Sequence, residues 1–163
     1  MEIVLVEPEI PGNTGNIARL CAGNHMTLHL VKPLGFSLDS KYLKRAGLDY
    51  WHLVDVKIHE NFEEVLEEYK DRRFWYATTK AEHTYADVKY EIGDMLVFGK
   101  ETKGLPEELL DKNRDTCIRI PMIDEARSLN LSNAVSVISY EGMRQLGFPD
   151  LREFGKLNMD IEV

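Results

Sequence analysis

Residues 11–19 could bind an anion, because a turn with two glycines leads there into a predicted helix. The segment reads P-G-N-T-G-N-I-A-R and follows a short apolar run at residues 3–6. Asn13 or Thr14 could cap the helix, and Arg19 would follow one turn into it. A guanidinium beside the partly positive N-terminus of a helix is suited to hold an anion such as a phosphate. A tight turn that only caps the helix explains the same residues equally well.

Two further polar loops follow apolar runs. Residues 98–106 read F-G-K-E-T-K-G-L-P, and their two glycines would let the backbone approach a ligand closely, although a simple surface turn explains them too. Residues 128–137 read S-L-N-L-S-N-A-V-S-V, with a polar side chain at every second or third position of a segment that is otherwise typical of a buried helix. A buried hydroxyl or amide without a partner costs about 1–3 kcal/mol. We therefore expect these side chains to have something to bind, since a helix cap accounts for only one or two of them.

Several familiar catalytic patterns are absent from the sequence. It contains no G-x-S-x-G, no H-E-x-x-H and no Walker loop, and the first glycine loop lacks the third glycine of a dinucleotide site. Cys21 and Cys117 are the only cysteines and form no C-x-x-C pair, and the five histidines are scattered. These features indicate neither a metal site nor a disulfide scaffold.

The composition indicates one soluble domain. The 163 residues are 44% hydrophobic and 29% charged, and no apolar run approaches the about 18 residues that a membrane span needs. The first residues, M-E-I-V-L-V-E, do not fit a secretory signal, so we expect a cytoplasmic protein.

The formal net charge of −8 at first argues against a nucleic-acid partner, but most of it lies in two segments. Residues 60–71 contain six acidic residues and one lysine, and residues 149–163 contain four acidic residues and two basic ones. The rest of the chain is nearly neutral. Local basic patches can still attract RNA, because charges act over a Debye length of about 8 Å.

Apolar runs and helical patterns alternate along the chain. Short apolar runs predict strands at residues 3–6, 27–31, 54–58, 74–77, 95–98 and 117–120. Helical spacing and caps predict one helix that begins near Asn13 and others at residues 40–46, 62–69, 106–112 and 133–146. This alternation predicts an α/β fold, with a mostly parallel sheet flanked by helices. Ligands of such sheets bind beyond the carboxyl ends of the strands, in loops such as the three described above.

The three loops together resemble the signature motifs of the SPOUT RNA methyltransferases. The motifs are N-x-G-N-I-x-R, F-G-x-E-x-x-G-L-P, and I-P-M followed by S-L-N-L-S-N-A-V, and they occur in the order of that family. The segments E-P-E-I-P-G-N-T-G-N, K-P-L-G-F and R-A-G-L-D-Y are similar to the single-domain branch that methylates the ribose of the wobble nucleotide, cytidine or uridine 34, in tRNA. The resemblance covers residues 1–148, which we expect to form the methyltransferase domain, and leaves residues 149–163 as an acidic tail.

The resemblance implies a deep trefoil knot near the C-terminus that binds S-adenosylmethionine, and a homodimer in which the last helix forms much of the interface. Motif by motif, the expected cofactor contacts are Ala77, Gly99, Ile120, Met122 and Ser128. Several of these residues are apolar because their backbone groups would make the contacts.

The resemblance also implies catalytic and RNA-binding roles. It places Arg19 at the RNA phosphate and the 2′-hydroxyl, with Asn13, Glu101 and Asn130 in supporting roles that hydrogen-bond either the loops or the nucleoside. The substrate would be the anticodon stem-loop of a tRNA. Three cations on one predicted helical face, beside aromatic residues, are candidates for RNA contact, although an exposed helix explains them equally well: Lys41, Lys44 and Arg45.

Two other functions are compatible with the sequence. The first is a 2′-O-methyltransferase for ribosomal RNA or another tRNA position, although such enzymes usually carry an extra RNA-binding domain. The second is a catalytically silent, dimeric RNA-binding protein, against which Arg19 and the intact cofactor loops argue.

Overall fold

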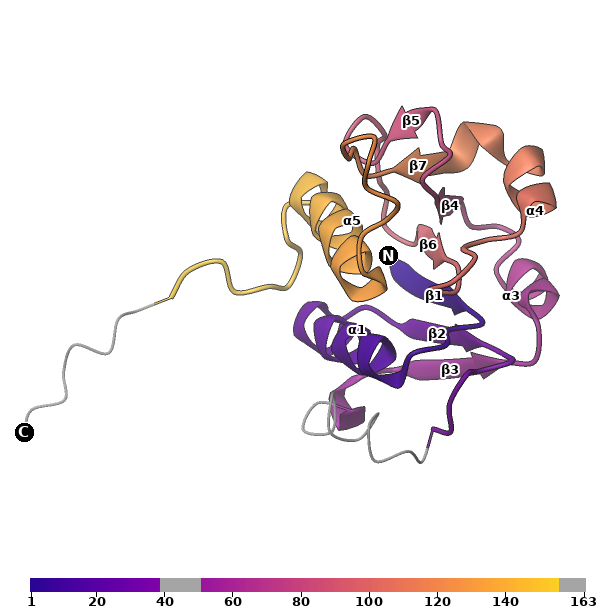
Figure 1. The fold of residues 1–163 in the computed structure, drawn as a ribbon. Coiled ribbons are helices and arrows are strands. Elements are labelled where there is room, and N and C mark those ends of the chain that lie inside the picture. Colours follow the sequence, from indigo (N-terminus) through magenta and orange to yellow (C-terminus); the bar gives the residue numbers. More distant parts are fainter. Residues whose placement is uncertain (39–50, 156–163) are drawn as a thin grey trace, which may run out of the picture.

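The computed structural model describes residues 1–38 and 51–155 and contains one seven-stranded sheet (Figure 1). The strand order is β3-β2-β1-β6-β4-β7-β5, and each pair of neighbouring strands is parallel. The strands are β1 (Glu2–Val6), β2 (Leu28–Val31), β3 (Val56–His59), β4 (Phe74–Ala77), β5 (His83–Thr84), β6 (Met95–Phe98) and β7 (Cys117–Arg119). The predicted parallel α/β architecture is confirmed, whereas the short strand β5 was not predicted.

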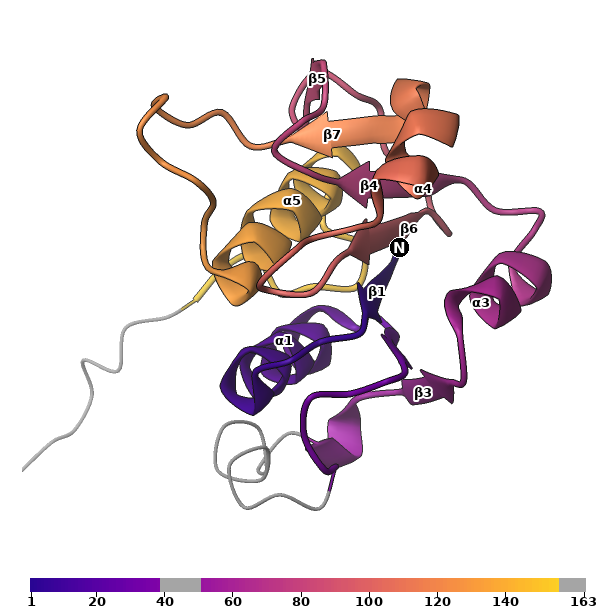
Figure 2. The same cartoon turned by 45° about the vertical axis from the view of Figure 1, so that its right-hand side comes forward.

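The helices cover both faces of the sheet (Figures 1 and 2). They are α1 (Pro11–Asn24), α3 (Phe62–Glu68), α4 (Glu107–Lys112) and α5 (Leu131–Gln145), with short 3-10 helices at Trp51–Leu53 and Arg114–Thr116. Among the described residues, no helix combines the length and apolar character that crossing a membrane requires.

Two apolar clusters hold these layers together. On one face, Ile17 of α1 and Ile138 of α5 pack with Leu5 of β1. On the other face, Val65 of α3 packs with Val4 of β1. Successive residues of a strand point to opposite faces, so a strand covered on both sides is apolar at every position. This is why the strands read as continuous apolar runs.

Helix α1 begins earlier than predicted. Its N-cap is Ile10, whose side chain cannot cap, and Asn13 and Thr14 lie inside the helix, so the predicted Asn13 or Thr14 cap is wrong. A distant side chain replaces the missing cap, because the Glu101 carboxylate accepts a hydrogen bond from the Ile10 backbone N–H at 3.2 Å. A carboxylate beside the first N–H groups of a helix stabilises it.

Helix α5 also begins earlier than predicted, with Asn130 as its N-cap. The Asn130 side-chain oxygen accepts hydrogen bonds from the Ser132 backbone N–H at 2.9 Å and the Ser132 hydroxyl at 2.7 Å. Further along, the Ser136 hydroxyl donates to the Ser132 carbonyl at 2.7 Å, and the Ser139 hydroxyl donates to the Ser136 carbonyl at 3.3 Å. The hydroxyls of Ser132, Ser136 and Ser139 therefore all have hydrogen-bond partners in this helix or its N-cap.

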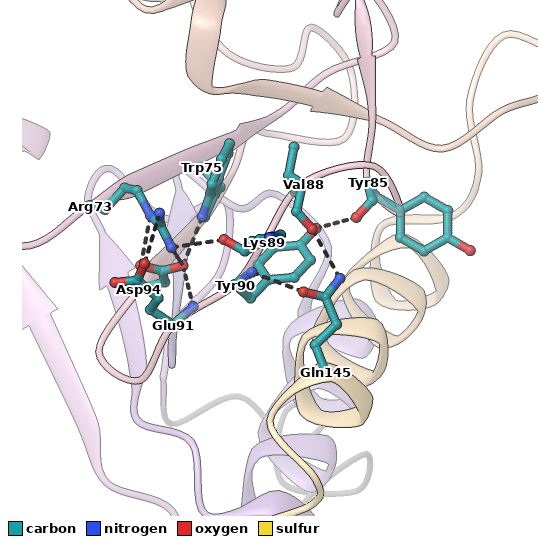
Figure 3. Close-up of polar contacts among 9 residues, drawn as sticks. All are labelled: Arg73, Trp75, Tyr85, Val88, Lys89, Tyr90, Glu91, Asp94 and Gln145. Carbon is teal, nitrogen blue, oxygen red and sulfur yellow. Dashed lines mark hydrogen bonds and ion pairs between the residues drawn. The ribbon is translucent and has the colours of Figure 1, made fainter.

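The C-terminal end of α5 is fixed to the segment between β5 and β6 (Figure 3). The Gln145 amide donates to the Val88 carbonyl at 3.0 Å and accepts from the Tyr90 backbone N–H at 3.0 Å. The same segment is held by buried Asp94, which accepts two hydrogen bonds from Arg73 at 2.7 and 3.1 Å. Together with the packing of Ile138 against Leu5, these contacts hold α5 on one face of the sheet.

Candidate active site

A cavity of about 580 Å³ lies where the predicted loops meet, at the carboxyl ends of β4, β6 and β7. The five residues expected to contact a cofactor all line it: Ala77, Gly99, Ile120, Met122 and Ser128. Three of the four expected catalytic residues line it as well: Asn13, Glu101 and Asn130. The parallel sheet brings these residues together because its strands end at the same edge.

The wall contributed by residues 99–104 is a closed loop. The Gly104 backbone N–H donates to the Lys100 carbonyl at 2.8 Å, and Gly104 adopts a φ of +68°, which favours glycine. A Cβ at Gly99 would lie 2.1 Å from the Gly104 backbone carbon. The two glycines of the second motif are therefore required by the closed shape of the loop.

Reciprocal hydrogen bonds join this loop to the segment before α1. The Glu9 backbone N–H donates to the Glu101 carboxylate at 2.8 Å, and the Glu9 carboxylate in turn accepts from the Thr102 N–H at 3.0 Å and the Thr102 hydroxyl at 2.8 Å. An ion pair between Lys100 and Glu7, 2.5 Å long, adds a third contact. These contacts hold the first and second motifs as one unit.

Asn13 connects the first and second motifs to the third. It is buried, with 6% of its surface exposed, and its amide donates to Glu101 at 3.0 Å. Its side-chain oxygen accepts from the Asn130 amide at 3.0 Å. The three residues thus hydrogen-bond the loops to one another, which is one of the two supporting roles predicted for them.

Arg19 lies apart from this cluster. It is exposed and is not among the described residues that line the cavity. At six residues beyond Asn13, it lies about 120° away around the helix axis. The predicted RNA contacts Lys41, Lys44 and Arg45 lie outside the described residues.

Sequence reasoning missed Glu9 and Thr102. Glu9 lies within the quoted segment E-P-E-I-P, but it bonds to a residue 93 positions away, which no local pattern could show.

The polar groups of the cavity limit the chemistry. Among the described lining residues there is no histidine and no cysteine, and the single carboxylate is that of Glu101. This carboxylate already accepts hydrogen bonds from two backbone N–H groups and from Asn13. In residues 1–38 and 51–155, no three His, Cys, Asp or Glu side chains are grouped so as to hold a metal ion. The arrangement is suited to bind and align reactants.

Comparison with known proteins decides the family. The model of the SpoU rRNA Methylase family matches residues 1–140. The chain belongs to the SpoU rRNA Methylase family. This SpoU chain is 50% identical over 150 residues to the tRNA (cytidine(34)-2′-O)-methyltransferase of Escherichia coli strain K12, covering 91% of the chain and 96% of the relative. It is also 50% identical over 148 residues to the enzyme of that name from Methylovorus glucosotrophus, covering 90% and 96%.

Solved structures resemble this SpoU chain over nearly its whole length. A structure from Bacillus anthracis superposes with a TM-score of 0.87 at 48% identity and covers 94% of the SpoU chain and 99% of its own. A second structure, from work on 2′-OH methylation of C/U34 on tRNA, gives a TM-score of 0.85 at 46% identity, with coverage of 90% and 95%.

Proposed function

We propose that this SpoU chain transfers a methyl group from S-adenosylmethionine to the ribose 2′-hydroxyl of the wobble nucleotide of tRNA, a cytidine or modified uridine at position 34. The observation that carries the proposal is the meeting of all three motif loops at one cavity. The substrate follows from the names of relatives that are half identical along nearly the full chain. We expect the reaction to take place in the cytoplasm.

The cavity fits the cofactor in size and in lining. Its volume of about 580 Å³ falls within the range of about 300–1,000 Å³ of small-molecule sites, which are mostly apolar with a few polar groups. Ala77, Ile120 and Met122 offer apolar walls beside backbone groups at strand ends, and Gly99 and Ser128 line the same cavity. Bound there, S-adenosylmethionine would supply a methyl group on a sulfonium that a ribose hydroxyl can attack in line.

Alignment is the main contribution required of the protein. Correct positioning of two reactants can supply about 7–11 kcal/mol of the barrier. One general base contributes about 10²–10⁴-fold, or about 3–5 kcal/mol. The only carboxylate among the described lining residues is engaged by three donors, which favours alignment over general-base catalysis.

A homodimer would complete the site. Arg19 lies on a different face of α1 from Asn13 and does not line the cavity of its own chain. We propose that it acts at the cavity of a second copy, where a fixed cation favours the developing alkoxide. Helices α1 and α5 lie side by side on one face of the sheet (Figures 1 and 2), and α5 exposes 43% of Tyr140. We place the dimer interface on this helical layer.

The remaining expectations from the sequence complete the proposal. The segment after β7 would thread through a preceding loop to form the trefoil knot, within a domain of residues 1–148. Lys41, Lys44 and Arg45 would contact the anticodon stem-loop, and catalysis would need no metal ion.

A methyl-transfer assay tests the function. Purified protein, bulk tRNA and labelled S-adenosylmethionine should give one 2′-O-methyl group at nucleotide 34, located by digestion and mass spectrometry. Arg19→Ala should nearly abolish turnover with little change in cofactor affinity. Methylation of ribosomal RNA, or of another tRNA position, would show that the proposed substrate is wrong. Tight tRNA binding without transfer would instead indicate a silent RNA-binding protein.

A further inference from the structure

The cavity is rich in positive charge on a chain whose formal net charge is −8. Among the described residues that line it, Glu101 carries the single carboxylate. Four lining residues are cations: Lys80, Lys100, Lys103 and Arg127. A cleft lined by one sign of charge raises the local concentration of ligands of the opposite sign. The cavity is therefore suited to an anion.

Two of these cations are already neutralised and two are not. Lys100 pairs with Glu7, and Lys80 pairs with Glu107. Within residues 1–38 and 51–155, the side chains of Lys103 and Arg127 form no hydrogen bond and no ion pair. Both residues are exposed, so their charges are available to a ligand at the mouth of the cavity.

The two cations come from different walls of the cavity. Lys103 belongs to the loop closed by the Gly104 to Lys100 hydrogen bond. Arg127 lies three residues before Asn130, which is bound to both Asn13 and the start of α5. Both residues therefore lie close in sequence to a hydrogen-bonded part of the cavity wall, and their exposed side chains can adjust to a ligand.

The charge of the two reactants decides which of them these cations suit. S-adenosylmethionine carries an ammonium and a sulfonium against one carboxylate, so it is cationic overall and gains little from two further cations. An RNA strand carries a negative phosphate at every nucleotide, and a guanidinium can donate two parallel hydrogen bonds to a phosphate. We propose that Lys103 and Arg127 form a phosphate clamp that grips the tRNA backbone beside the target nucleotide. This inference rests on the proposed function and adds a further RNA contact to those predicted at Arg19 and at residues 41–45.

Salt-dependent binding tests the clamp. Lys103→Gln, Arg127→Gln and the double variant are compared with wild type for tRNA affinity between 50 and 200 mM salt. For a single strand, each phosphate contact contributes about 0.7 to the slope of log K against log salt. We expect each substitution to reduce the slope by about 0.7 and the double variant by about 1.4. The KM for tRNA should rise several-fold, with kcat at saturating tRNA and cofactor affinity unchanged.

Matched variants control for charge and folding. Lys112→Gln removes the same charge from an exposed residue of α4 that does not line the cavity, and it should leave the slope unchanged. Arg127→Lys keeps the charge and should restore the slope, although it cannot restore bidentate geometry. Because both clamp residues are exposed, thermal unfolding should not change in any of these variants.

Three outcomes separate the possibilities. Unchanged salt slopes and an unchanged KM for tRNA in the double variant would overturn the clamp. Weakened cofactor binding with unaltered tRNA binding would also overturn it, because the cations would then serve the cofactor carboxylate. Absence of methyl transfer in the wild-type protein would overturn the proposed function alone, since the salt slopes of RNA binding would still decide the clamp.

Discussion

The side-chain amide of Asn130 donates to the side-chain oxygen of Asn13 over 3.0 Å, across 117 positions of the sequence. Asn13 also donates to Glu101, so one buried amide connects all three motif loops. The other end of the Asn130 side chain caps α5. The shape of the cavity and the start of its bordering helix therefore depend on the same side chain.

Substitutions at Asn130 should separate capping from loop contact. Asn130→Asp keeps a good N-cap but loses the donor to Asn13, whereas Asn130→Ala loses both. We expect both variants to bind S-adenosylmethionine more weakly, and Asn130→Ala to lose about 1 kcal/mol more stability than Asn130→Asp. Calorimetric titration and urea unfolding measure the two effects. Equal stability of the two variants would contradict the capping role.

Glu101→Gln should destabilise the joined loops. Its carboxylate accepts backbone N–H bonds from Glu9 and Ile10, and an amide nitrogen in place of one oxygen would leave one of these donors without an acceptor. Such a loss costs about 1–3 kcal/mol. Urea unfolding should show the loss, together with weaker cofactor binding. Glu153→Gln, a change at an exposed residue beyond α5, is the control and should have no effect.

Gly99→Ala should disrupt the loop that forms one wall of the cofactor site. The added Cβ would meet the Gly104 backbone carbon at 2.1 Å, so the loop must open. We expect methyl transfer to fall at least tenfold and cofactor affinity to fall with it. Gly23→Ala in α1, where nothing lies within 4 Å of the new Cβ, serves as the control. It should keep activity and gain up to about 1 kcal/mol of stability.

The free energy of unfolding should fall at acid pH because the linked side chains of Glu2, His29 and His59 include groups whose pKa is lowered in the folded state. His29 is fully buried, and its ring lies 2.6 Å from Glu2 and 2.9 Å from His59. Burial alone would raise the pKa of Glu2, but hydrogen bonds from His29 and Arg72 outweigh it and lower the pKa to about 2. The unfolded chain then takes up the proton first as pH falls. The contribution of Glu2 should be complete above its ordinary pKa of 4.5 and be lost between pH 4.5 and 2.

His59 extends the acid sensitivity to higher pH. Burial, reinforced by nearby His29, lowers the pKa of His59 below its ordinary 6.5. The unfolded state again binds the proton first, so stability should begin to fall as the pH drops below 6.5. Urea unfolding at pH 7 and 5.5 measures the effect of His59, and further measurements at pH 4 and 3 measure that of Glu2. Glu2→Gln should flatten the part below pH 4.5 only, and a profile identical to wild type would remove Glu2 from the explanation.

The fold could be predicted where the signal is local. The bounds of β4 and β6 were predicted to the residue, because strands covered on both faces require uninterrupted apolar runs between polar turns. The order of the three motifs, and the parallel sheet that places their loops at one edge, also followed from the sequence.

Only the tertiary structure shows which hydrogen bonds join those loops and which of their cations are paired. The Glu101 carboxylate accepts from the backbone at the start of α1, and the Glu9 carboxylate accepts from Thr102 in the glycine loop. Asn130, the N-cap of α5, donates to Asn13. Each contact joins residues about 90 or more positions apart, so helix propensity and the local spacing of residues cannot predict it. The sequence also does not show that Lys80 and Lys100 form ion pairs with glutamates, whereas Lys103 and Arg127 remain available to bind a phosphate. The sequence determined which residues reach the edge of the sheet, and the folded chain determined which of them remain available to a substrate.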